Sequence, residues 1–176
     1  MPAVMKNIAK MEKKTGKKWN STKNPLLVSV RSGAAISMPG MMDTILNLGL
    51  NEKTVEGFAE QTKNPRFSWD SYRRFIQLFG KVVFGVNDEK FDHVLDAAKE
   101  KQGVIDDSKL NVESLKIIVK EYKKICEEHT KRKFPDTPDE QLVLSIEAVF
   151  KSWMGERAIV YREKNNITKD LSLIHI

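Results

Sequence analysis

The stretch NPLLVSVRSGAAISMPGMMDTILNLGLN, residues 24–51, separates this chain from an ordinary helical protein and decides its fold. It carries one cation, Arg31, and one anion, Asp43, among many Gly, Ser, Ala and Met residues. Its first run, PLLVSV (25–30), is short, apolar and bounded by Asn-Pro and Ser-Gly, which predicts a buried strand. We interpret the later run MMDTILNLGL (41–50) as a short helical stretch that ends near Gly49.

The end of this strand has the chemistry of an anion-binding loop. Because successive strand residues point to opposite faces, Val28 and Val30 can be buried while Ser29 and Arg31 face away. The planar guanidinium of Arg31 matches two phosphate oxygens at once. Gly33 lets the backbone approach an anion closely and offer its N–H groups. The segment therefore predicts contacts to a phosphate-bearing ligand.

The following residues extend this prediction. Ser32 and Ser37 offer hydroxyl donors, and Pro39-Gly40 makes a turn before further free N–H groups. The pattern is not a Walker A loop, since it lacks the lysine of GxxxxGK[ST]. In the alternative interpretation, Arg31 is buried and ties down an ordinary strand-to-helix connection.

The rest of the chain has the pattern of amphipathic helices. A first helix carries Val4, Ile8 and Met11, and Gly16 ends it. Further helices fill residues 51–134, with N-caps predicted at Asn51, Ser68, Asn87 and Asn111. Thr137, Pro138 and Glu140 predict the start of another helix, which ends at Gly155. RAIVYR (157–162) predicts a strand, so the fold class is α+β and mostly helical.

Composition excludes several classes of protein. Hydrophobic residues make up 40% and charged residues 31% of 176 residues, which is a globular composition. No apolar run reaches the roughly 20 residues of a membrane span, and no secretory signal is visible. The single cysteine, Cys126, excludes an internal disulfide and fits a cytoplasmic location. The net charge of +6 leaves open an independent basic helical module that binds nucleic acid or a protein partner.

Residues 24–51 resemble the N-terminal nucleotide-binding domain of the pyruvate, phosphate dikinase family of phosphoenolpyruvate-utilising enzymes. The resemblance continues through VEGFAEQTKNPRFSWDSYRRFIQLFG, VFKSW and RAIVYR, in the order of the family. It implies an incomplete ATP-grasp-like domain with an inserted helical subdomain. It also implies a Mg²⁺-dependent reaction of ATP, inorganic phosphate and pyruvate that gives AMP, diphosphate and phosphoenolpyruvate.

The resemblance also implies which residues bind ATP and which partners act with them. A phosphohistidine on a separate swivelling domain of the full-length chain would carry the phosphoryl group, and the full-length protein would be a homodimer. No nucleic acid or membrane partner is expected. The resemblance implies that the metal ligands lie outside this chain. His93, His129 and His175 lack the phosphohistidine motif of the family, so the phosphohistidine is expected outside this chain as well. The chain alone is therefore expected to be inactive. The ATP and phosphate site would comprise Arg31, Ser32, Gly33, Ser37, Met38, Pro39 and Gly40.

These considerations predict how the chain is organised. Residues 1–50 would be part of the first ATP-grasp lobe, residues 51–134 a helical subdomain, and residues 135–170 a return to the first lobe. Residues 171–176, LSLIHI, have the sequence expected of a translated sequencing adaptor, and we interpret them as a non-native tail.

Overall fold

The computed structural model of this protein describes residues 1–33, 36 and 38–168. Within them the fold is mostly helical, with one antiparallel two-stranded sheet. None of the helices in these ranges is long and apolar enough to cross a membrane. In chain order the elements are α1 Pro2–Thr15, β1 Val28–Arg31, β2 Thr44–Leu48, α2 Thr54–Thr62, α3 Pro65–Phe84, α4 Asp88–Gln102, the 3₁₀ turn η1 Asp107–Lys109, α5 Val112–Thr130, α6 Pro138–Ser152 and α7 Glu156–Lys164.

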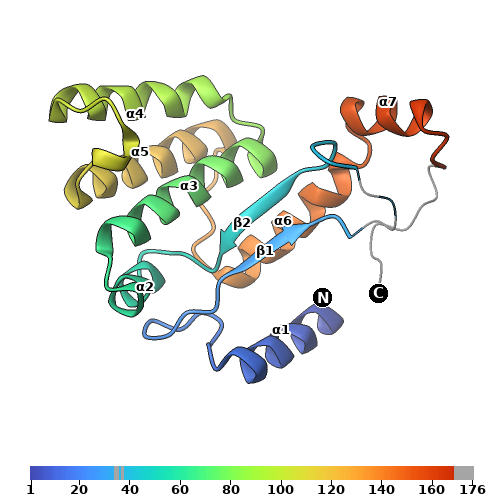
Figure 1. Ribbon diagram of the computed structural model, residues 1–176, viewed down its shortest axis with the longest axis horizontal. Helices are drawn as coiled ribbons and strands as arrows, with labels where there is room; N and C mark the ends of the chain where they lie inside the picture. Colours follow the sequence, from blue (N-terminus) through green and yellow to red (C-terminus); the bar gives the residue numbers. More distant parts are fainter. Residues whose placement is uncertain (34–35, 37, 169–176) are drawn as a thin grey trace.

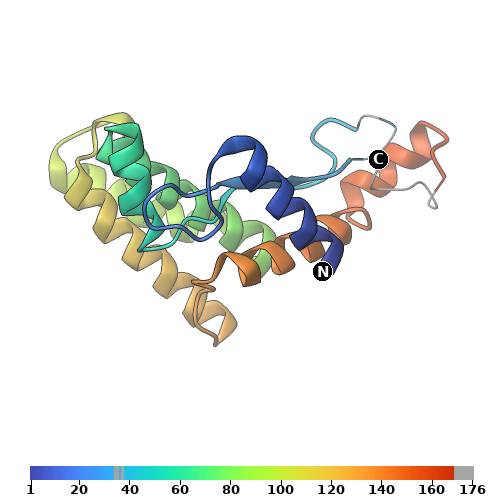
Figure 2. The same ribbon diagram turned by 90° about the horizontal axis from the view of Figure 1, so that it is seen from below.

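The elements form an elongated molecule (Figure 1). Helices α3, α4 and α5 lie at one end, and α7 lies at the other end beside the loop that joins the strands. The hairpin and α6 connect the two ends, and β2 contacts both α3 and α6. Helix α6 contacts both strands of the hairpin, and Figure 2 shows it along one side of them. The predicted tail, residues 171–176, lies outside the described residues.

The prediction of a helix over residues 41–50 is wrong, because residues 44–48 form β2. Ile45 and Leu48 are both fully buried, and their spacing of three is typical of a helix. The sheet accommodates this spacing through an irregularity, since Val30 pairs with Ile45 but Val28 pairs with Leu48. Asn47 adopts φ 61°, a left-handed conformation that a regular strand does not use. The strand predicted at 25–30 is confirmed with bounds shifted to 28–31, but its predicted burial is wrong, because its residues are half-buried or exposed.

The prediction of a strand over RAIVYR is also wrong, because these residues lie in α7. Gly155 precedes the helix in an extended conformation, so it begins α7 rather than ending α6. Glu156 lies in the first turn and Arg162 and Lys164 in the last, an arrangement that the helix dipole favours. Short β-branched runs such as Ile-Val are compatible with either structure, and these end effects favour the helix.

Side-chain caps account for most helix starts. The predicted caps at Asn87, Asn111 and Thr137 are confirmed, since each side chain accepts a hydrogen bond from the backbone of the first turn. Asn51 likewise accepts from the N–H of Thr54 at 2.8 Å, just before α2. The cap predicted at Ser68 is wrong, because α3 begins three residues earlier and Asn64 caps it.

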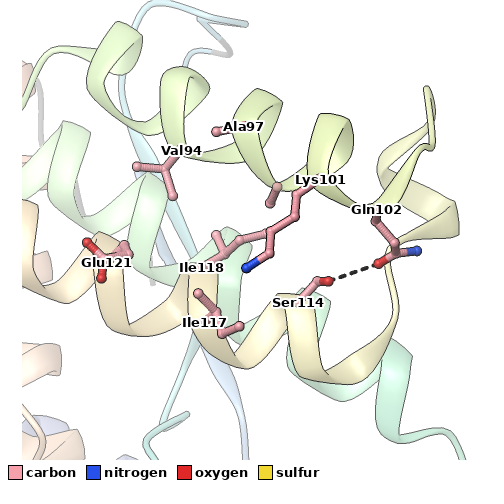
Figure 3. Close-up of a pocket in the computed structure, with 9 residues that line it drawn as sticks. Val94, Ala97, Lys101, Gln102, Ser114, Ile117, Ile118 and Glu121 are labelled. Carbon is pink, nitrogen blue, oxygen red and sulfur yellow. Dashed lines mark hydrogen bonds between the residues drawn. The ribbon is translucent and has the colours of Figure 1, made fainter.

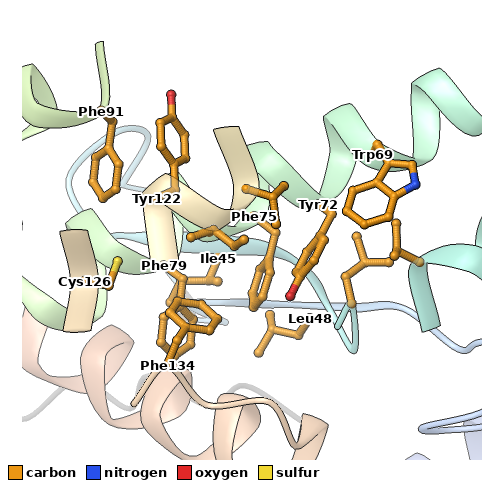
Figure 4. Close-up of a cluster of buried hydrophobic side chains, with 14 of the residues drawn as sticks. Ile45, Leu48, Trp69, Tyr72, Phe75, Phe79, Phe91, Tyr122, Cys126 and Phe134 are labelled. Carbon is orange, nitrogen blue, oxygen red and sulfur yellow. The ribbon is translucent and has the colours of Figure 1, made fainter. Parts of the chain in front are cut away.

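The core is a continuous cluster centred on the aromatic stripe of α3 (Figure 4). Tyr72, Phe75 and Phe79 are fully buried, and Phe134 packs edge-on against both phenylalanines. Tyr122 of α5 contacts Phe91 of α4 with 4.8 Å between ring centroids. This cluster joins the α3–α5 end of the molecule to the hairpin.

Two neighbouring arginines of α3 are held by one carboxylate. Arg73 is only 2% exposed, and its guanidinium donates to Asp70 Oδ1 at 2.6 Å. Arg74 is exposed, and its Nε donates to Asp70 Oδ2 at 3.1 Å. Asp107 of η1 lies 3.5 Å from Arg73 and extends the pairing. Arg73 therefore links α3 to η1, whereas Arg74 pairs within α3.

A buried amide joins the two ends of the segment 51–134. The side chain of Gln141 has no exposed surface. Its Oε1 accepts from the N–H of Gly49 at 3.1 Å, and its Nε2 donates to the carbonyls of Leu50 and Pro135 at 3.0 Å. The side chain of Asn51 donates to the carbonyl of Asp136 at 2.9 Å. The chain thus enters and leaves the helical segment at one place.

We predict that Gly57→Ala destabilises the protein, although alanine is normally the better helix former. A Cβ atom at Gly57 would lie 1.9 Å from the carbonyl oxygen of Thr22, so α2 and the preceding loop would have to separate. We expect the free energy of unfolding to fall by about 1–3 kcal/mol in urea denaturation. The matched control Glu60→Ala, on the exposed face of α2, should change it by no more than about 0.5 kcal/mol. A Gly57→Ala variant as stable as the parent would contradict the close approach.

We predict that Cys126 makes the protein less stable at alkaline pH. Burial raises the pKa of its thiol to about 12, whereas the unfolded thiol titrates near about 8.5. Above that value the unfolded chain releases a proton that the folded chain keeps, so the free energy of unfolding falls as pH rises. Between about pH 8 and about pH 9.5, below the usual titration of tyrosine and lysine, we expect a loss of about 1 kcal/mol.

Urea denaturation at both pH values measures this loss. Cys126→Ala is the matched variant. In each protein the quantity of interest is the change in the free energy of unfolding between the two pH values, so a lower absolute stability of the variant does not affect the comparison. An equal difference in the parent and in Cys126→Ala would show that the thiol is not responsible.

Candidate functional site

The candidate site is the connection between β1 and β2, at the α7 end of the molecule (Figure 1). Arg31 is the last residue of β1 and pairs with Thr44 of β2. The burial of β1 alternates as predicted, with Ser29 and Arg31 exposed and the two valines half-buried. Arg31 is thus not the buried arginine of the alternative interpretation, and in the described part of the chain no carboxylate pairs with it.

The loop residues that the sequence singles out lie close along the backbone of this connection. Ser32 is half-buried and Gly33 exposed, directly after Arg31. Pro39 and Gly40 form an exposed turn, which the hydrogen bond from the N–H of Met41 to the carbonyl of Met38 closes at 3.2 Å. Gly40 has φ 72° and open space around its missing Cβ. Ser37 lies outside the described residues.

The corner between α6 and α7 anchors the returning arm of the loop. The N–H of Asp43 donates to Ser152 Oγ at 3.2 Å, near the end of α6. Arg157 of α7 donates to the carbonyl of Gly40 and to Asp43 Oδ1, both at 3.3 Å. Asp43 therefore neither begins a helix nor belongs to a carboxylate cluster; it precedes β2 and pairs with Arg157.

Sequence reasoning missed both anchoring residues. Ser152 and Arg157 lie 109 and 114 positions after Asp43, so no local pattern links them to the loop. The one available signal was the break SWMGER, where a Gly is followed by two charged residues. Because residues 157–162 were interpreted as a strand, the break was not interpreted as the start of a helix.

A shallow cavity of about 400 Å³ lies between the loop and α7. Met41 and Val160 supply apolar surface, Arg157 and Lys164 supply positive charge, and Glu156 supplies one negative charge. Met42, in contrast, packs against the core. Apolar surface beside cations suits a ligand that has both an aromatic group and negative charge.

Another arginine of α7 serves the fold instead. Arg162 is 5% exposed, its guanidinium stacks 4.0 Å from the ring of Trp153, and it donates to the carbonyl of Trp153. It is therefore unavailable to a ligand. The arginines near this end differ in role, and Arg31 and Arg157 are the two that solvent reaches.

The described residues include no group of three or more His, Cys, Asp or Glu side chains that could hold a metal ion. His93 of α4 and His129 of α5 are exposed and lie on helices at the other end of the molecule. The groups that the described part of the loop offers are a guanidinium, a hydroxyl and backbone N–H groups, which are chemically able to contact an anion.

Comparison with known proteins gives consistent matches over nearly the whole chain. Residues 1–174 match the family described as pyruvate phosphate dikinase, AMP/ATP-binding domain. The chain is 51% identical over 168 residues to the pyruvate, phosphate dikinase of Giardia intestinalis, 52% over 170 to that of Entamoeba histolytica and 50% over 168 to that of Clostridium symbiosum. These alignments cover 96%, 97% and 95% of this chain but 19% of each relative. The chain thus spans about a fifth of the length of these curated relatives.

We predict that Ser152→Ala loosens the returning arm of the loop. The variant removes the acceptor of the Asp43 N–H, and such a hydrogen bond contributes about 0.5–1.5 kcal/mol. Hydrogen exchange of the Asp43 amide should therefore become about 2- to 10-fold faster. The amide of Val86, which is bonded to the carbonyl of Gly80 in another part of the molecule, serves as the internal control. Unchanged exchange at Asp43 would mean that Ser152 does not hold the loop.

Proposed function

This chain belongs to the pyruvate phosphate dikinase AMP/ATP-binding domain family, and we propose that it forms part of the ATP site of a pyruvate, phosphate dikinase. That enzyme converts ATP, pyruvate and phosphate into AMP, phosphoenolpyruvate and diphosphate through a phosphohistidine. Because the chain spans about a fifth of its relatives, the proposal assigns the complete reaction to a longer protein. The described part contributes binding of the nucleotide phosphates.

The observation that carries this proposal is the placement of Arg31. Its guanidinium is exposed at the end of a strand whose register is fixed, and no described carboxylate neutralises it. The loop of small residues that follows offers backbone N–H groups at short range. Phosphoryl transfer depends on positioning and on neutralising negative charge more than on covalent help from the protein. Arg31 and its loop supply both.

We assign the phosphate contacts to Arg31, Ser32, Gly33, Ser37, Met38, Pro39 and Gly40. Met41 and the cavity beside it lie where the apolar part of a nucleotide would have room. Anchoring by Ser152 and Arg157 would keep the loop in place before the ligand arrives. A preorganised loop loses less entropy on binding than a free one.

An ATP-grasp-like fold is the architecture that we propose for the complete domain. The described hairpin has only two strands, so each strand has one edge without a described partner. Such edges are normally paired or covered. We propose that residues 1–50 and 135–170 belong to the first lobe, that residues 51–134 form a helical subdomain, and that further strands complete the sheet.

The remaining participants follow from the same proposal. Mg²⁺ would be held by the nucleotide and by ligands other than the described residues, which do not form a metal site. Inorganic phosphate would be the second acceptor, and a swivelling phosphohistidine domain of the same chain would receive the phosphoryl group. We further propose a cytoplasmic homodimer. An independent module that binds nucleic acid is not favoured, because it explains the charge but not the family match.

We predict that Arg31→Ala in the full-length enzyme lowers kcat/KM for ATP by about 100-fold, the usual effect of removing one group that stabilises developing charge. The KM for pyruvate should remain unchanged, because pyruvate reacts at another site. Formation of AMP from ATP at varied ATP concentration measures the effect.

Arg132→Ala is the matched control, since Arg132 is an exposed arginine that follows α5. It should leave both constants unchanged. If Arg31→Ala and Arg132→Ala behave alike, Arg31 does not bind the nucleotide phosphates.

A further inference from the structure

A second cavity lies between α4 and α5, at the end of the molecule away from the phosphate loop (Figures 1 and 3). Its volume is about 440 Å³, within the range of small-molecule sites. Both helices contribute to its lining. The apolar lining comes from Val94, Ala97, Ala98, Ile117 and Ile118.

One end of this cavity is polar and rigid. Ser114 donates from Oγ to Gln102 Oε1 at 2.9 Å, as Figure 3 shows. Gln102 Oε1 also accepts from the N–H of Asn111 at 3.0 Å, and Gln102 Nε2 donates to the carbonyl of Lys109 at 2.9 Å. Three hydrogen bonds therefore hold the Gln102 amide, and this end of the cavity is formed before any ligand binds.

Lys101 places a positive charge over the apolar surface. In Figure 3 its side chain extends from α4 toward α5, and the ammonium lies near Ile117 and Ile118. Within the described ranges no carboxylate pairs with Lys101, whereas Lys99 on the same helix pairs with Asp96 at 2.7 Å. The one carboxylate of the lining, Glu121, lies at the opposite end from Gln102. It would repel a second negative group, so the charges favour a ligand with a single anionic head.

From this combination we infer that the α4–α5 cavity binds a small amphipathic monoanion, a carboxylate with a short hydrocarbon tail. The carboxylate pairs with Lys101, and the tail lies against Ala97, Ile117 and Ile118. Each methylene that leaves water strengthens binding by about fourfold, so a tail of several carbons is needed for measurable affinity. This site is separate from the ATP site, and its test does not depend on catalysis.

Octanoate is the probe, titrated into the 176-residue chain by isothermal calorimetry. We expect saturable binding at one site per chain, weaker binding of the uncharged 1-octanol by about threefold, and no binding of acetate, which lacks the tail. Circular dichroism establishes that each variant is folded.

Two pairs of variants test the contacts. Lys101→Gln should weaken octanoate about threefold and remove its advantage over 1-octanol, while Lys90→Gln, an exposed lysine elsewhere on α4, should change nothing. Ala97 lines the cavity and is exposed, so Ala97→Phe should abolish binding because the phenyl ring fills the cavity. Ala97→Ser keeps the space open and should preserve binding.

Retained one-site binding in a folded Ala97→Phe variant would overturn the inference. Equal binding of octanoate and 1-octanol to the parent would also overturn it, since Lys101 would then have no role. Sedimentation of the parent and of Ala97→Phe gives a third outcome: a parent dimer that the substitution disrupts would identify the cavity as a self-association surface and exclude the ligand.

Discussion

The burial of β2 between α3 and α6 is the interaction on which the loop end of the molecule depends. Ile45 and Leu48 have no exposed surface and belong to the same cluster as the aromatic stripe of α3. Since the core fixes β2, and β2 pairs with β1 in one register, the position of Arg31 opposite Thr44 is fixed as well. A slip of one residue would turn Arg31 to the other face of the hairpin. The hydrophobic core thus decides where the exposed guanidinium points.

Local chemistry accounts for what the sequence predicted correctly. Asn87, Asn111 and Thr137 cap helices through residues two or three positions away, so their roles are visible in the sequence. The exposure of Arg31 follows from the alternation of a strand. The family resemblance, carried by residues 24–51, is confirmed by the match over residues 1–174. The role of the loop in binding ATP stays a prediction.

The errors arise where two structures share one pattern. The buried pair Ile45 and Leu48 has helical spacing, and only the irregular pairing with β1 and the left-handed Asn47 reconcile it with a strand. RAIVYR is short and β-branched, yet Gly155 and Glu156 begin a helix there. Ser152 and Arg157 reach the loop from more than a hundred positions away, and such contacts depend on the complete fold. The net charge also counts all arginines alike. It does not distinguish Arg73, which is buried and paired, from Arg31, which is exposed.

The hydrogen bonds of Gln141 and Asn51 bring residues 49–51 and 135–136 together. The helical segment between them has more than eighty residues, and the chain therefore enters and leaves it at neighbouring positions. When the two ends of a segment are neighbours, its length and internal sequence can drift without moving the residues that flank it. Evolution can in this way lengthen or shorten the segment between α4 and α5, while α3, which packs against β2, keeps the hairpin and the loop between its strands in place.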